Sequence, residues 1–181
     1  IQIAGSGEAS SIVFQDDGPV LVSEAVVIAT VDEDGLPGHN ADAGRPGEVA
    51  GTGSAVATGS LASLVDFGTD GPGANAFHLV TQIAPVDTGL TSQGGHVLIV
   101  SDGTTLHGYV ESGNGSGFTA GDREIFTLTV GPDGSYTFTL KDQVDHPSQN
   151  NVIGDDSENS LAATLDLSGF IVATDGDGDF V

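Results

Sequence analysis

Residues 124–140 read Glu-Ile-Phe-Thr-Leu-Thr-Val-Gly-Pro-Asp-Gly-Ser-Tyr-Thr-Phe-Thr-Leu. Apolar side chains alternate with threonines on both sides of the Gly-Pro-Asp-Gly run, which is the period of a strand with one buried and one wet face. Aromatic and β-branched residues favour strands, and a short Pro-Asp-Gly loop between two such runs is typical of a hairpin. The stretch therefore predicts two antiparallel strands, 124–130 and 135–140, with their threonines on the outer face.

The same two-residue alternation recurs along the chain, whereas helical periodicity is nearly absent. A short helical turn is the alternative to a strand within residues 61–67. The expected strands and Gly, Asp and Pro turns predict an all-β fold, an antiparallel, Ig-like β-sandwich with long Gly/Asp-rich loops. Besides the hairpin, strands are expected at 11–14, 20–30, 59–67, 76–82, 96–101, 104–111 and 161–174.

A length of 181 residues suits one domain. We expect residues 1–18 to hold a terminal strand and a junction with a neighbouring unit, and residues 19–181 to form a single domain. The chain opens on Ile1 inside an apparent strand, so we interpret it as a piece of a larger protein. No stretch is long enough for a transmembrane span, and the absence of Cys excludes disulfides and thiolate metal sites.

Charge is the dominant compositional signal. Twenty-six acidic residues face three basic ones (Arg45, Arg123 and Lys141), which gives a formal net charge of −23. Such a surface repels nucleic acid and anionic membranes, because binding to phosphate needs Lys and Arg. High ionic strength or bound divalent cations make this charge tolerable, and both conditions favour a location outside the cytoplasm.

The acidic residues gather in short clusters that follow strands or occupy Gly-rich turns. Ca²⁺ takes six to eight oxygen ligands in proteins, and glycines between aspartates let the backbone curl so that several carboxylates face one point. The alternative is that these are ordinary solvated turn acids. As calcium ligands the sequence predicts Asp16, Asp17, Asp32, Glu33, Asp34, Asp122, Asp145, Asp175, Asp177 and Asp179.

Six segments also occur in the order found in a known family: Asp16–Pro19, Val31–Gly35, Asp122–Val130, Gly134–Leu140, Asp145–Pro147 and Ala173–Asp179. In this respect the chain resembles the large repeat domain, of the T1SS-143 type, of type I secreted RTX adhesins. The resemblance implies export by type I secretion and a place on the bacterial cell surface, in cell adhesion and biofilms. It also implies tandem calcium-bound β-sandwich repeats, each with its neighbours in the same chain as partners. The family's calcium ligands would correspond to Asp16, Asp17, Asp32, Asp34, Asp175, Asp177 and Asp179.

The expected function is that of a calcium-stiffened extender that projects adhesive regions from the cell and is monomeric as a fragment. A calcium-dependent module that binds surface glycans is the alternative. No enzyme is expected, because the five histidines form no HExxH spacing and the chain has neither a G-x-S-x-G elbow nor a Cys nucleophile. Paired carboxylates leave a glycosidase dyad open, although aromatic residues make up only 6% and Trp is absent.

Overall fold

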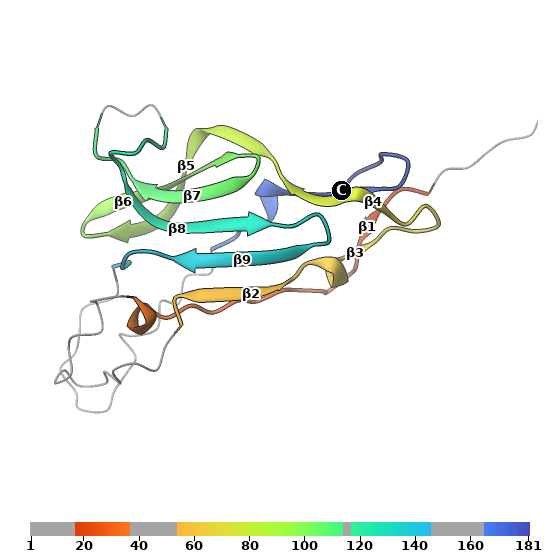
Figure 1. The fold of residues 1–181 in the computed structure, drawn as a ribbon, viewed down its shortest axis with the longest axis horizontal. Coiled ribbons are helices and arrows are strands. Elements are labelled where there is room, and N and C mark those ends of the chain that lie inside the picture. The colour runs from red at the N-terminus through yellow and green to blue at the C-terminus, as the bar shows by residue number, and fades with distance from the viewer. Residues whose placement is uncertain (1–16, 37–53, 114–116, 146–164) are drawn as a thin grey trace, which may run out of the picture.

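The computed structural model describes residues 17–36, 54–113, 117–145 and 165–181. Within these ranges the chain forms antiparallel strands and three single-turn 3₁₀ helices, which confirms the all-β prediction (Figure 1). The helical turns are η1 (Glu33–Gly35), η2 (Ala62–Leu64) and η3 (Ser168–Phe170). The strands are β1 (Val20–Leu21), β2 (Val56–Ser60), β3 (Val65–Asp66), β4 (Pro72–Leu79), β5 (Thr81–Ser92), β6 (Gly95–Asp102), β7 (Thr105–Val110), β8 (Arg123–Val130), β9 (Ser135–Leu140) and β10 (Ile171–Asp175).

A six-stranded antiparallel sheet, in the order β2-β9-β8-β7-β6-β5, forms one layer. The predicted β8–β9 hairpin lies near its centre, and within it Thr127 pairs with Thr139. Gly131 closes the turn by donating its N–H to the Ser135 carbonyl at 2.7 Å, and Gly134 adopts a φ of 82°. Glycine suits this position because it reaches positive φ without a steric penalty.

The second layer is built from two small antiparallel pairs, β10 with β4 and β1 with β3. Residues 179–181 fold back along β10, where Ala173 and Val181 exchange two backbone hydrogen bonds of 2.9 Å. Apolar side chains of the large sheet, including Ile99 and Phe126, pack against Leu79 and Phe170 to form the main core. A smaller core lies under β4 and β10 around Phe77, so the layers make a sandwich-like body.

Strand limits differ from the sequence prediction where turn-forming residues interrupt or bound the strands. β5 runs from Thr81 to Ser92, although Pro85, Asp87 and Gly89 argue against a strand; two register irregularities accommodate them at this sheet edge. The strand expected at 20–30 is regular only over β1, and the one expected at 161–174 only over β10. The strand expected at 11–14 lies outside the described residues.

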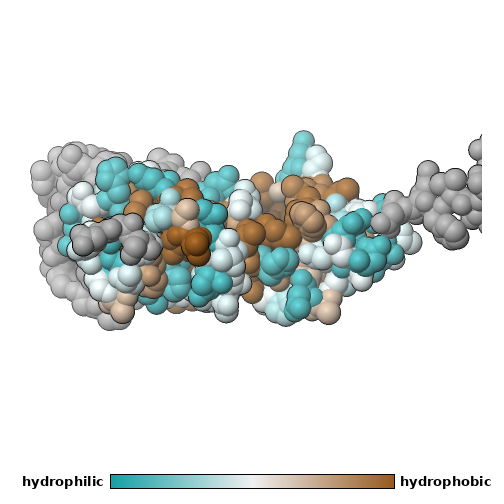
Figure 2. Space-filling model, turned by 90° about the horizontal axis from the view of Figure 1, so that it is seen from above, coloured by the Kyte–Doolittle hydropathy of each residue, from teal (hydrophilic) through white to brown (hydrophobic). Residues whose placement is uncertain are grey.

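The surface mixes hydrophilic residues with several apolar patches (Figure 2). Among the exposed apolar side chains are Leu21, Ile28, Ile83 and Phe180. None of the helices in the described ranges is long and apolar enough to cross a membrane.

Candidate metal centre

Three aspartates meet where β10 ends beside the loop that leads into β4. Asp175 is the last residue of β10 and pairs with Pro72 at the start of β4, which brings the Asp70 loop against the turn that follows β10. Gly176 makes this close approach possible, because a Cβ at that position would lie 2.5 Å from the Asp70 carbonyl oxygen. As a result, Asp70, Asp175 and Asp177 each place one carboxylate oxygen within 4.8 Å of the others.

Asp175 is the buried member of this cluster, with 2% of its surface exposed. One oxygen, Oδ1, accepts the backbone N–H groups of Gly178 at 3.0 Å and Asp179 at 2.8 Å. The other, Oδ2, is buried without a hydrogen-bond partner. Burial raises the pKa of Asp175, but hydrogen bonds from backbone N–H groups, first that of Gly178, outweigh it and hold that pKa below its usual value. The carboxylate is therefore charged at neutral pH and lacks a donor on one oxygen.

Two further aspartates adjoin the cluster from both ends of the described chain. The Asp17 Oδ2 accepts the Thr69 hydroxyl at 3.2 Å, and a Cβ on Gly68 would lie 2.6 Å from the same oxygen. The Asp179 carboxylate lies against Gly18, 3.4 Å from where a Cβ would be placed. Residues 17–18 thus pass between the loop before β4 and the turn after β10. Of the predicted ligands, Asp17 therefore meets Asp175, Asp177 and Asp179 at one end of the molecule, whereas the other predicted ligands that the structure describes lie elsewhere.

No protein cation balances this end within the described ranges. Their two Lys and Arg residues, Arg123 and Lys141, pair with Asp142 and Glu124. These pairs lie at the start of β8 and just after β9, the opposite end of the hairpin from its turn. Arg45 lies outside the described residues. Two like charges about 4 Å apart repel by about 1 kcal/mol in water and about 4 kcal/mol near a protein surface, so a bound cation would relieve this cluster.

The donor set fits a hard divalent cation. Three carboxylates offer only oxygen, which Ca²⁺ and Mg²⁺ prefer, and the exposed Asp70 and Asp177 leave room for water or backbone carbonyls as further ligands. The Asp175 Oδ2 is the kind of unsatisfied buried group that an ion resolves.

At the opposite end of the large sheet from the three aspartates, the predicted ligands Glu33 and Asp145 accept hydrogen bonds from the protein itself. Glu33 accepts the Val144 backbone N–H at 2.6 Å, and Asp145 accepts the N–H groups of Gln93 and Gly94 at 2.8 and 2.9 Å. Hydrogen bonds from the Thr91 side chain and from the Gly94 backbone lower the pKa of Asp145.

Arg123 supplies positive charge to this same far end. Its guanidinium donates to Asp142 at 2.6 Å, to the Ser92 hydroxyl at 2.8 Å and to the Ser92 carbonyl at 2.7 Å. Here an arginine pairs with Asp142. Asp32 directly precedes η1 and Asp34 is its middle residue, whereas the predicted ligand Asp16 lies outside the described residues.

Asp122 organises the loop between β7 and β8. Its two oxygens accept the backbone N–H and the hydroxyl of Ser112 (2.9 and 3.0 Å) and those of Thr119 (2.7 and 2.8 Å). The hydrogen bond from the Ser112 backbone, with those from Thr119, lowers the pKa of Asp122 to about 2. Four donors occupy this carboxylate, which favours loop closure over metal binding.

Comparison with known proteins gives one match. The family model for a domain of unknown function, DUF5801, matches residues 28–181. The chain belongs to the DUF5801 family. No curated protein and no solved structure shows a significant match.

Sequence reasoning missed one member of the candidate centre of this DUF5801 chain, Asp70. The Asp70-Gly71-Pro72 run has the same form as Asp17-Gly18-Pro19, in which the sequence predicts a calcium ligand. It follows a loop, however, rather than an evident strand. Only the pairing of β4 with β10 shows that this run lies beside Asp175. Repetition of the Asp-Gly-Pro pattern was the available signal.

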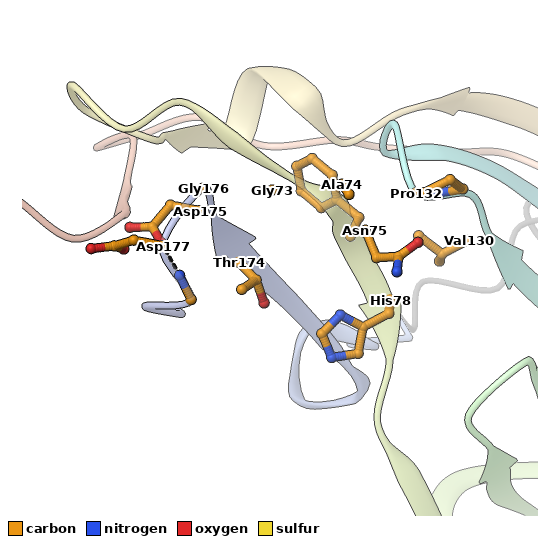
Figure 3. Close-up of a pocket in the computed structure, with 12 residues that line it drawn as sticks. Gly73, Ala74, Asn75, His78, Val130, Pro132, Thr174, Asp175, Gly176 and Asp177 are labelled. Carbon is orange, nitrogen blue, oxygen red and sulfur yellow. Dashed lines mark hydrogen bonds between the residues drawn. The ribbon is translucent and has the colours of Figure 1, made fainter.

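A cavity of about 700 Å³ borders the centre of the DUF5801 chain. Asn75, His78 and Thr174 contribute polar side chains to it, and Val130 and Pro132 contribute apolar ones. Figure 3 shows the carboxylates of Asp175 and Asp177 together on the side of their loop away from Asn75 and His78. An ion held by the carboxylates would therefore not face a ligand held by those side chains.

Proposed function

We propose that this domain is a calcium-stabilised structural module of a secreted bacterial surface protein, in which bound Ca²⁺ stiffens the end where residues 17–18 and 175–181 meet. The buried Asp175 Oδ2, unpartnered beside the carboxylates of Asp70 and Asp177, carries the proposal. The lack of a nearby arginine or lysine within the described ranges supports it, since the equivalent acids at the other end have Arg123.

The spacer role is supported by what the ion would join. Asp70 precedes β4, whereas Asp175 ends β10 and Asp177 follows it, so the ion would join two segments far apart in sequence. Asp17 and Asp179 connect the first and last described segments to the same place. β1 and β3 pair over only two residues, which is a weak attachment by itself. An ion would fix these segments to the β4–β10 pair, and adjacent domains of one chain would then keep their relative direction. The location outside the cell rests on the net charge and on the resemblance to RTX adhesins.

Calcium titration tests the metal centre directly. Calorimetry on the chain should show Ca²⁺ binding, and a thermal melt should show a higher Tm with excess Ca²⁺ than with a chelator. Asp175→Asn should weaken binding by about 10-fold or more, since it removes a charged ligand at the buried position.

Asp87→Asn is the matched control, because it removes one carboxylate from the exposed β5 while its Oδ1 can still accept the Gly89 N–H. The metal centre would be refuted by equal Ca²⁺ affinity in wild type and Asp175→Asn. It would also be refuted by a Tm that is the same with excess Ca²⁺ and with a chelator. A glycan array separates the alternative function: a spacer shows no selective hit, whereas a glycan-binding module shows one that depends on Asn75 or His78.

A further inference from the structure

Residues 22–32 run antiparallel to the segment that contains β2. At one end the Val22 N–H donates to the Leu64 carbonyl at 2.9 Å, and at the other the Asp32 N–H donates to the Ser54 carbonyl at 2.9 Å. The same number of residues separates these two contacts on each segment. Neither segment therefore has a residue in excess, and one register extends from the first contact to the second.

A tight turn occupies the corresponding place in each of these segments. Ala25 donates its N–H to the Val22 carbonyl at 3.2 Å, and Leu64 donates its N–H to the Leu61 carbonyl at 2.9 Å. Because Val22 lies opposite Leu64, the two turns face each other. The rest of the first segment, residues 26–31, then runs alongside β2 (Figure 1).

The edge of β2 that faces residues 26–31 is open to them. β2 is the last strand of the large sheet in the described ranges, and no hydrogen bond joins it to residues 26–31. The Ala55 carbonyl accepts the Leu140 N–H on the side of β9. Since backbone groups alternate along a strand, those of Thr58 and Ser60 point to the open edge, where both residues are exposed.

Side chains in residues 26–31 already alternate as in a strand. Val27 packs against the smaller core and Val31 against the main core, whereas Val26 and Ile28 are 75% and 82% exposed. This is the two-residue period of a strand with one buried face. The segment can pair with β2 without turning its apolar side chains to the other face.

The Ser54 side chain occupies the backbone groups at the start of this edge. Its hydroxyl donates to the Val56 carbonyl at 2.8 Å and accepts the Val56 N–H at 3.2 Å. In the register of the Asp32–Ser54 contact, Val56 lies opposite Thr30. The hydroxyl thus competes with Thr30 for these groups, as serine side chains do where they bond to nearby backbone.

We propose that residues 26–31 close onto the open edge of β2 as a further strand of the large sheet, in competition with the Ser54 hydroxyl. In the closed form Thr30 pairs with Val56 and Ile28 pairs with Thr58. An open edge invites pairing with strands of other chains, and closure covers it. The accessibility of this edge is then set by one serine.

Amide hydrogen exchange on the whole chain, followed by NMR in wild type and Ser54→Ala, tests the closure. We expect the variant to slow exchange at Ile28 and Thr30 several-fold, because their N–H groups point to β2 as that of Asp32 does. The N–H of Ala29 points away and should keep its rate. Unchanged exchange at Ile28 and Thr30 overturns the proposal, and so does equal slowing at Ala29.

A strand from a second copy is the other possible occupant of the edge. Slowing that disappears when the protein is diluted would show such an occupant and would overturn closure by residues 26–31.

Two proline variants in the Ser54→Ala background provide a matched pair. Ile28→Pro removes an N–H that points to β2 and should restore fast exchange at Thr30. Ala29→Pro removes an N–H that points away from β2, which an edge strand tolerates, so Thr30 should remain slow. Equal exchange at Thr30 in the two variants would contradict the proposed pairing.

Discussion

At the scale of single residues, the same side chain has two different roles in this domain. Asp122 and Asp145 accept hydrogen bonds from the loops around them, whereas Asp175 keeps one buried oxygen unpartnered. The sequence indicates acids in turns at all three positions. It does not distinguish them, because the donors that occupy Asp145 lie more than fifty residues away at Gln93 and Gly94.

Asp122 predicts a pH dependence. Its pKa is lowered to about 2 by the hydrogen bonds from Ser112 and Thr119, so the folded state binds this proton less readily than the unfolded chain. The stabilisation is fully present above about pH 4, the ordinary range of an aspartate, and is lost as pH falls toward about 2.

Asp122→Asn should therefore lower the free energy of unfolding by about 1–2 kcal/mol at neutral pH, discounted because the group is partly exposed. Urea unfolding of both proteins at a series of pH values measures the difference. The difference should shrink between about pH 4 and pH 2. A difference that stays constant over this interval would show that the carboxylate charge is not responsible.

Arg123 and Lys141 should differ in how much their removal lowers the free energy of unfolding. Arg123→Ala removes the guanidinium that donates to Asp142 and to the Ser92 carbonyl, and it should cost about 3 kcal/mol because a partly buried ion pair is broken. Lys141→Ala removes a pair whose lysine is 43% exposed and should cost less than about 1 kcal/mol. Chemical denaturation of the two variants side by side tests this order, which equal losses would contradict.

At the scale of elements, the β8–β9 hairpin was the most predictable part of the fold. Its alternation, its threonine pairs and its turn residues all indicate one structure, and local sequence alone determines them. β5 was the least predictable, since Pro85 and Gly89 signal loops and only pairing with β6 holds them in a strand. The meeting of β4 with β10 joins segments about a hundred residues apart, so no local pattern reveals it.

The hairpin turn predicts the effect of a single methyl group. At Gly134 a Cβ would lie 2.9 Å from the Phe77 ring, and the φ is 82°. Gly134→Ala therefore combines backbone strain with overpacking and should cost about 2–4 kcal/mol. Gly89→Ala is the control: its φ is 77° but no atom lies within 4 Å, so strain alone should cost about 1 kcal/mol. Equal midpoints in urea for the two variants would contradict the contact with Phe77.

At the scale of the whole molecule, the all-β sandwich-like fold follows from composition and alternation, while the grouping of the acids does not. A net charge of −23 indicates that cations must screen or bind the acids, but it does not indicate at which residues they bind. The structure places Asp142 beside Arg123 at one end and groups Asp70, Asp175 and Asp177 at another, where neither of the two described Lys and Arg residues lies. This division depends on tertiary contacts, so the calcium ligands predicted from sequence remain a prediction.

Net charge predicts different responses to sodium and to calcium. NaCl screens the repulsion among exposed acids and should raise Tm by a few degrees. A site held at about 100 times its dissociation constant adds about 2.7 kcal/mol, which corresponds to a rise in Tm of about 5–11 °C for a domain of this size. Calorimetric scans at matched ionic strength separate the two effects. Identical melting curves in NaCl and CaCl₂ would show that general charge screening, and not a specific calcium site, accounts for the stabilisation.

The position of residues 17–18 between the Asp70 loop and the turn after β10 has a mechanical consequence. A pull applied between residues 17 and 181 acts first on the contact of Asp17 with Thr69 and on the backbone hydrogen bonds between Val181 and Ala173, which flank the carboxylate cluster. If the proposed Ca²⁺ is bound there, its coordination bonds would resist that pull together with these hydrogen bonds, and the mechanical strength of the domain would depend on the surrounding calcium concentration.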